Sequence, residues 1–148
     1  MNQLSSILSP ENILLDINAT SKKRAFEQAA LLFENNKGIA RSTVFDGLFS
    51  RERLGSTALG HGVAIPHGRI PKLDKAYAAF IRLSNAIPFD APDGQNVQLL
   101  VILLVPESAT QQHLDLLAQI AQKLSDESVR QQLLSSDDPQ HIYNLLSS

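Results

Sequence analysis

Residues 97–105 form the apolar run that most constrains the fold of this chain. The run reads VQLLVILLV, so only Gln98 interrupts it and the residues do not alternate between apolar and polar. A strand that is covered on both faces shows this pattern, whereas a strand with one face in water alternates. The run is also far shorter than the roughly 20 apolar residues of a membrane-spanning helix. It therefore predicts a central strand buried on both faces, and no insertion into a membrane.

Further strands and helices are expected before and after this run. Apolar residues at 13–17 and 76–83 favour two more strands. Between them, Ser21 is a suitable N-cap and Gly38 a suitable C-terminal stop for a helix whose apolar residues share one face. A second helix is expected to begin at the possible cap Ser42.

The C-terminal third of the chain predicts only helices. Helical spacing of apolar residues continues through 110–124 and 126–134, and the Asp138–Pro139 pair combines an N-cap with proline at the first helical position. The inward-facing residues of the first of these helices would be Leu114, Leu117, Ile120, Ala121 and Leu124. Helices that flank a few strands in this order indicate the α/β class, with a mixed sheet covered on both sides.

The composition limits both size and chemistry. A chain of 148 residues without a low-complexity linker is expected to form one domain over 1–148, with a core of about 4–146. A net charge of −2 provides no basic face for nucleic acid, and the lack of cysteine excludes thiolate chemistry. The N-terminus lacks the pattern of a secretion signal, so a cytoplasmic protein is expected.

Residues 54–71 break the apolar periodicity. Glycines stand at positions 55, 60, 62 and 68, and prolines at positions 66 and 71. Such a segment is expected to be held by turns rather than by strand pairing, although 63–65 could pair as a strand. Irregular segments of this length in a compact domain are usually functional or disordered. The segment is therefore the first place to search for a site.

His67 is the strongest candidate nucleophile in this segment. It lies between Pro66, which restricts the backbone, and Gly68, which permits conformations closed to other residues, so a stiff bend with an exposed imidazole is expected. A neutral imidazole nitrogen attacks phosphorus well near pH 7, because its ordinary pKa of about 6.5 leaves it mostly deprotonated. The alternative is an ordinary histidine in a surface loop.

Two other residues could assist His67. His113 lies in the first turn of a helix that follows the central strand, where free backbone N–H groups could keep its ring neutral and ligands collect in α/β folds. Arg51, in the last turn of the second helix, would supply the fixed positive charge that phosphoryl transfer needs. Either residue could instead be structural, His113 as a cover for apolar neighbours and Arg51 as a partner of the helix dipole. Glu52 is expected to be a solvated neighbour.

Four blocks of sequence resemble one known family. They are RERLGST at 51–57, GVAIPHGR at 62–69, FDAPDGQ at 89–95 and LLVPESATQQHLDLLAQIA at 103–121. Together they resemble the enzyme IIA domains of the fructose/mannitol type (type 2) of the bacterial phosphotransferase system, and most closely its nitrogen-regulatory members. The resemblance extends over nearly the whole chain.

The resemblance implies a fold, a site and partners. The fold would be a mixed, mostly parallel sheet flanked by helices. His67 would carry the phosphoryl group on Nε2, with His113 as the second active-site histidine and Arg51 steadying the group, and no cofactor or metal would be needed. The donor would be a histidine-containing phosphocarrier protein. The output would be the regulation of nitrogen or potassium metabolism through binding to targets such as potassium transporters or sensor kinases.

Three alternatives stay open. The chain could be a sugar-transport enzyme IIA that passes phosphate to enzyme IIB for fructose or mannitol uptake. His61, His67 and His113 could instead be three ligands of a catalytic zinc ion. Finally, the protein could be a binding module in which His67 is chemically inert.

Overall fold

The apolar run at 97–105 forms the central strand of a mixed sheet, as predicted. The structure is a computed structural model that describes residues 2–108 and 111–148. In this part of the chain the sheet order is β1-β5-β6-β3-β2, and β4 also pairs with β6. The strands are β1 Ile13–Ile17, β2 Ala58–Gly60, β3 Val63–Ala64, β4 His67–Ile70, β5 Tyr77–Ile87 and β6 Val97–Pro106. Strand β6 runs parallel to β3 and β4 and antiparallel to β5, so it joins the two halves of the sheet.

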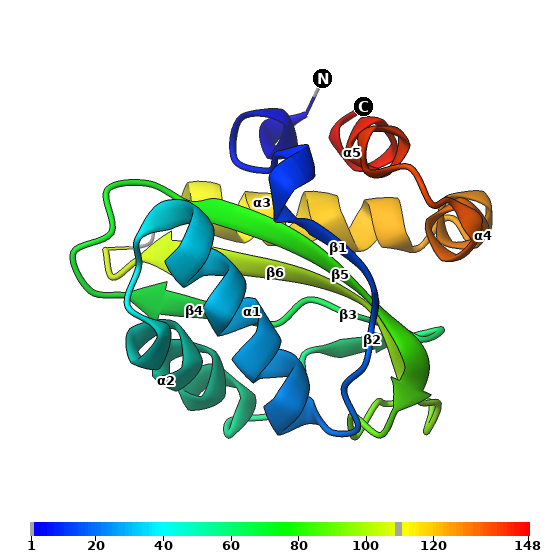
Figure 1. Ribbon diagram of the computed structural model, residues 1–148, viewed down its shortest axis with the longest axis horizontal. Helices are drawn as coiled ribbons and strands as arrows, with labels where there is room; N and C mark the ends of the chain where they lie inside the picture. The colour runs from blue at the N-terminus through cyan, green and yellow to red at the C-terminus, as the bar shows by residue number, and fades with distance from the viewer. Residues whose placement is uncertain (1, 109–110) are drawn as a thin grey trace.

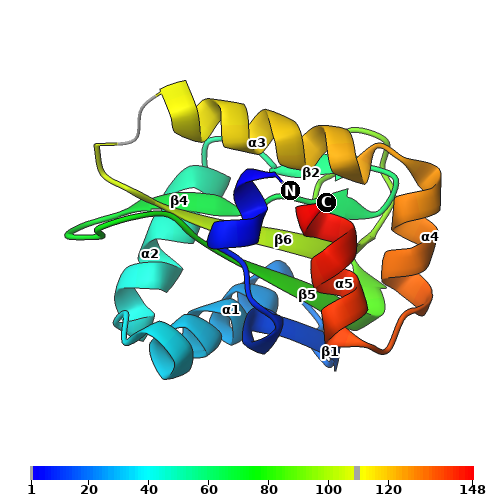
Figure 2. The same cartoon turned by 90° about the horizontal axis from the view of Figure 1, so that it is seen from above.

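Helices cover both faces of the sheet, which confirms the α/β class (Figure 1). One face packs against α1 and α2, and the other against α3, α4, α5 and the N-terminal 3-10 turns, with a separate apolar cluster on each side (Figure 2). The bounds are α1 Lys22–Lys37, α2 Arg41–Glu52, α3 Gln111–Leu124, α4 Glu127–Ser135 and α5 Pro139–Ser147. The short turns η1 Gln3–Ser6 and η2 Pro10–Asn12 precede β1. Within the described residues, no helix is both long and apolar enough to cross a membrane.

The helix boundaries follow side-chain capping in most cases. The Ser21 hydroxyl accepts a hydrogen bond from the Arg24 N–H, and Gly38 ends α1 in the left-handed region at a φ of 69°. The expected cap at Ser42 is wrong, because α2 begins at Arg41. The Glu34 carboxylate of α1 accepts the hydrogen bond from the Arg41 N–H at 2.9 Å. The Glu34 side chain of α1 therefore caps the start of α2 in place of a local residue.

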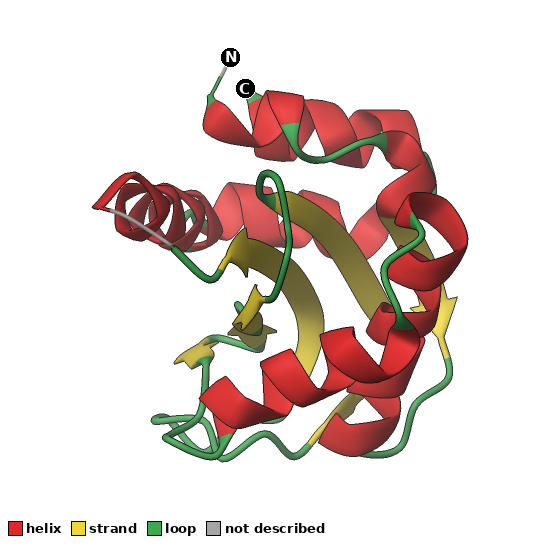
Figure 3. Cartoon of the chain, turned by 90° about the vertical axis from the view of Figure 1, so that its left-hand side faces the viewer, coloured by secondary structure: helices red, strands yellow, loops and turns green. Residues whose placement is uncertain are grey.

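Two other expectations need correction. Leu114 was expected to face the core, but it is 58% exposed, whereas Leu116 is buried. Residues 54–71 are not held by turns alone, because they contribute three short strands, β2, β3 and β4. The expected start of the helix at Thr110 lies outside the described residues. Figure 3 shows the resulting layers from the side, with the sheet between the helices.

Candidate functional site

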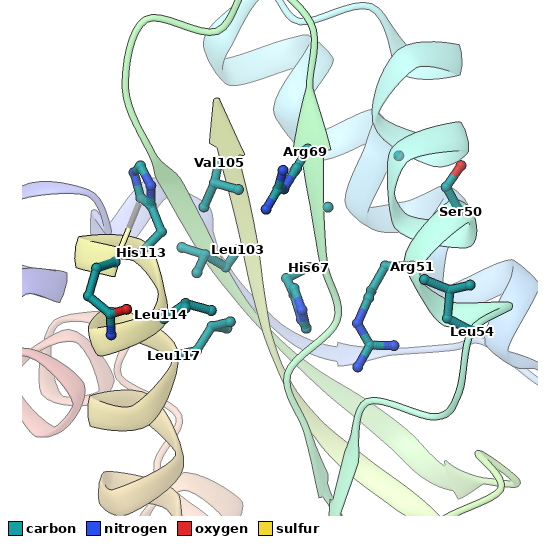
Figure 4. A pocket seen from close by; sticks show the side chains of 13 residues that line it. Ser50, Arg51, Leu54, His67, Arg69, Leu103, Val105, His113, Leu114 and Leu117 are labelled. Carbon is teal, nitrogen blue, oxygen red and sulfur yellow. The ribbon is translucent and has the colours of Figure 1, made fainter. Parts of the chain in front are cut away.

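A pocket of about 640 Å³ opens where β4, the end of β6, the last turn of α2 and the first turns of α3 meet (Figure 4). It brings together the three residues singled out in the sequence, His67, Arg51 and His113. The other lining residues are Gly47, Ser50, Leu54, Gly68, Arg69, Leu103, Val105, Gln111, Leu114 and Leu117. Residues far apart in sequence therefore meet in one cavity beside the central strand.

His67 begins β4 and its ring stands in the middle of the pocket (Figure 4). Its backbone pairs with Leu103 of β6, so the expected bend is in fact the first residue of a strand, and the ring is half-buried rather than exposed. The Nδ1 atom lies 2.8 Å from the Ile65 carbonyl oxygen. Because a carbonyl only accepts hydrogen bonds, Nδ1 must carry the proton and Nε2 is left with its lone pair.

The surroundings of His67 keep its ring neutral. Burial lowers the pKa of His67 below its ordinary value, and the nearby Arg51 charge lowers it further. The hydrogen bond to Ile65 and the Glu52 carboxylate act in the opposite direction, but the net pKa shift is downward. The pocket therefore favours, near pH 7, a neutral imidazole with an unprotonated Nε2, which is the nucleophilic form.

Gly68 is required by close packing. The sequence suggested that Gly68 permits conformations closed to other residues, but its φ is not in the positive, left-handed region. A Cβ at Gly68 would instead lie 2.5 Å from the Gly47 carbonyl oxygen of α2. The two glycines let α2 approach β4 closely, and this approach brings Arg51 to His67.

Arg51 and His113 occupy opposite walls of the pocket (Figure 4). The Arg51 guanidinium group lies beside the His67 ring, and its Nη1 donates a hydrogen bond to the Gly55 carbonyl at 2.8 Å. His113 is the third residue of α3, and in this view its ring points toward the rim rather than toward His67.

Glu52 is a residue that the sequence reasoning misjudged. It was expected to be solvated, but it is only 7% exposed. Its carboxylate accepts hydrogen bonds from the Thr57 N–H and hydroxyl and from the Lys22 ammonium group. Its partner Lys22 lies 30 residues away on α1, so no local pattern could have revealed the pair.

His61 does not join the pocket. It lies in the turn between β2 and β3, where its N–H donates to the Asp93 carboxylate at 2.8 Å and its φ is 56°. Across the described part of the chain, no three His, Cys, Asp or Glu side chains gather as a possible metal site. The zinc alternative, which needed His61 beside His67 and His113, is therefore contradicted by the geometry.

Comparison with known proteins assigns the chain to a family. The family model for the phosphoenolpyruvate-dependent sugar phosphotransferase system, EIIA 2, matches residues 6–148. The chain belongs to this family. The match confirms the resemblance that the four sequence blocks indicated.

Nitrogen regulatory proteins share more sequence identity with this chain than a fructose-specific EIIA component does. The nitrogen regulatory protein of Bradyrhizobium diazoefficiens is 42% identical over 144 residues, which cover 97% of this chain and 94% of that protein. The crystal structure of nitrogen regulatory protein IIA-Ntr from Neisseria meningitidis is 45% identical, with a TM-score of 0.94, covering 99% of this chain and 100% of that one. The fructose-specific EIIA component of Haloferax volcanii is 30% identical, covering 99% of this chain and 96% of that protein.

Proposed function

We propose that this protein is a regulatory phosphocarrier that accepts a phosphoryl group on Nε2 of His67. The donor would be a histidine-containing phosphocarrier protein of the phosphotransferase system, in the cytoplasm. The observation that carries the proposal is the hydrogen bond from Nδ1 to the Ile65 carbonyl, which leaves Nε2 unprotonated in an open pocket. Membership of the EIIA 2 family supports the reaction class.

The proposed transfer needs little acid or base chemistry. The Nε2 lone pair attacks phosphorus while the donor imidazole leaves with the electron pair of the breaking P–N bond. The proton stays on Nδ1, where the Ile65 carbonyl stabilises the positive charge that builds on the ring. Catalysis then depends on in-line positioning and on charge opposite the phosphoryl oxygens.

Arg51 and His113 would supply the charge and the hydrogen bonds from the two walls. Arg51 lies beside His67 and would bind the oxygens of the transferring group with its fixed positive charge. His113 would donate a hydrogen bond from the other wall after its ring turns inward from the rim. The exposed apolar rim residues, Leu54 and Leu114, would contact the donor.

Phosphorylation from a reconstituted donor system tests this function. The protein is incubated with phosphoenolpyruvate, enzyme I and a histidine-containing carrier, and its intact mass is measured. We expect the gain of one acid-labile phosphoryl group, its loss in His67→Ala, and its retention in His141→Ala, which changes an exposed histidine outside the pocket. No gain with a donor set that phosphorylates a known enzyme IIA would refute the proposal and favour a binding module.

The regulatory output would be phosphorylation-dependent binding to target proteins. The similarity to nitrogen regulatory proteins supports this role over transport. Targets such as potassium transporters or sensor kinases of nitrogen and potassium metabolism are proposed here as the class to be tested. Affinity for each target, measured with the phosphorylated and unphosphorylated protein, should differ; equal affinities would refute regulation through that target.

A sugar-transport role is the second candidate, because a fructose-specific EIIA component is also similar over nearly the whole chain. In that role the phosphorylated protein would pass its phosphoryl group to an enzyme IIB for fructose or mannitol. Rapid transfer to such a IIB would favour transport. Retention of the phosphoryl group in its presence would favour regulation.

A further inference from the structure

A largely buried ion pair joins Glu52, the neighbour of Arg51 in sequence, to Lys22 of α1. The Glu52 side chain is 3% exposed and the Lys22 side chain 18% exposed, and their charged atoms are 3.0 Å apart. Lys22 also lies over the Phe89 ring, 4.4 Å from its centroid. Burial of a carboxylate costs free energy unless it is paired and hydrogen-bonded. The position of the Glu52 carboxylate is therefore tied to its partners.

Among the described residues, the other hydrogen bonds of the Glu52 carboxylate come from one residue, Thr57. Oε1 accepts from the Thr57 hydroxyl at 2.7 Å, and Oε2 accepts from the Thr57 N–H at 3.0 Å. These two bonds close the turn that follows α2. Within that turn the Gly55 N–H donates to the backbone carbonyl of Glu52 at 3.1 Å. Glu52 therefore contacts both Thr57 and Gly55.

The turn closed by Glu52 holds the guanidinium group of Arg51. Arg51 Nη1 donates a hydrogen bond to the Gly55 carbonyl at 2.8 Å. A long, half-buried arginine has several rotamers, and a fixed acceptor selects one of them. The position of the Arg51 charge beside His67 therefore depends on the position of Gly55.

We propose that Glu52 is a positioning residue for phosphoryl transfer, acting through Thr57 and Gly55 to hold the Arg51 guanidinium beside His67. The inference rests on the proposed phosphocarrier function. Lys22 pairs with the Glu52 carboxylate at 3.0 Å and offsets part of its negative charge. The ion pair thus holds Glu52 in place while Arg51 supplies the positive charge that the phosphoryl oxygens would meet.

A double-mutant cycle separates this role from a merely structural one. Glu52→Gln should slow phosphoryl uptake about 10-fold or more, since displacement of a catalytic charge by about 1 Å can cost up to about 100-fold. In an Arg51→Ala background the same substitution should change the rate less than about 2-fold, because the residue it positions is gone. Equal rate losses in both backgrounds would overturn the inference.

A second pair of variants keeps the test valid if Glu52→Gln folds poorly. Thr57→Val removes the hydroxyl that Glu52 binds, whereas Ser56→Ala removes a neighbouring hydroxyl that donates to the Phe89 carbonyl at 2.6 Å and does not contact Glu52. We expect Thr57→Val to slow uptake and to merge the separate Arg51 Nη–H signals in NMR spectra through free rotation. Ser56→Ala should keep the wild-type uptake rate and the separate Arg51 signals. Unchanged Arg51 signals in Thr57→Val would refute the positioning role.

These outcomes also distinguish the inference from the function on which it rests. If the wild-type protein takes up no phosphoryl group, the proposed function fails. If the wild type is phosphorylated normally while the variants behave additively with Arg51→Ala, only the positioning role of Glu52 fails.

Discussion

Substitution of Gly68 by alanine tests whether the contact between α2 and β4 sets the site. The Cβ of Gly68→Ala would lie 2.5 Å from the Gly47 carbonyl oxygen and 2.6 Å from its carbonyl carbon, about 1 Å short of ordinary contact. Both atoms belong to backbone, so no side chain can move aside. Helix α2 must therefore shift away from β4, and Arg51 at its end would shift with it.

The shift predicts two measurable losses. Overpacking of this kind costs about 1–3 kcal/mol of unfolding free energy. A displacement of about 1 Å between reacting groups can lower a rate about 100-fold. Thermal unfolding followed by circular dichroism measures the first, and the initial rate of phosphoryl uptake by the folded variant measures the second.

Gly47→Ala is the matched control on the other side of the same contact. Its Cβ would meet the Ile70 Cδ1 atom at 2.7 Å and the Arg69 carbonyl oxygen at 3.3 Å. The Ile70 side chain can turn away, and alanine is favoured over glycine in a helix by up to about 1 kcal/mol. Its losses should be much smaller than those of Gly68→Ala. Wild-type stability and rate in Gly68→Ala would refute the account of how α2 is placed.

Three further predictions follow from other parts of the structure. Titration of the His67 ring by NMR should give a pKa below about 6.5, because burial disfavours its charged form. Between the folded-state pKa and the unfolded-state pKa of about 6.5, the unfolded chain binds more protons than the folded chain. Stability from His67 is therefore complete above about pH 6.5 and is lost as pH falls through the folded-state pKa; a midpoint above 6.5 would contradict this. Arg82→Leu, which leaves the Leu133 and Ser136 carbonyls without their buried donor, should lower unfolding free energy by about 2–3 kcal/mol; an unchanged melting temperature would count against it. Leu54→Ser, at a side chain 83% exposed on the pocket rim, should raise the KM for the donor protein while stability stays within about 0.5 kcal/mol; an unchanged KM would remove Leu54 from the interface.

Strong local signals predicted the parts of the fold that depend on local physics. The apolar run at 97–105 became the central strand β6, and the caps Ser21 and Asp138 begin helices as expected. The cap at Ser42 failed because Glu34 reaches across from another helix. A strand within 63–65 was anticipated and is β3, but strands β2 and β4 were missed because they are three and four residues long and form only by pairing with β3 and β6.

The site was predictable to the extent that its residues have distinctive neighbours. The Pro-His-Gly sequence pointed to His67, and the resemblance indicated Arg51 and His113, which line the same pocket. Glu52 could not be found this way, because its burial depends on Lys22 and on a turn that closes only in the folded chain. Similarly, the need for glycine at 68 arises from tertiary contact with Gly47 and not from local backbone geometry.

The most direct test of the account is to identify the phosphorylated atom. The protein is labelled with ¹⁵N, phosphorylated through the donor system, and studied by long-range ¹H–¹⁵N correlation of its histidine rings. We predict phosphorus on Nε2 of His67, with the proton still on Nδ1 and bound to the Ile65 carbonyl. A phosphoryl group on Nδ1 of His67, or on His113 or another residue, would contradict the account.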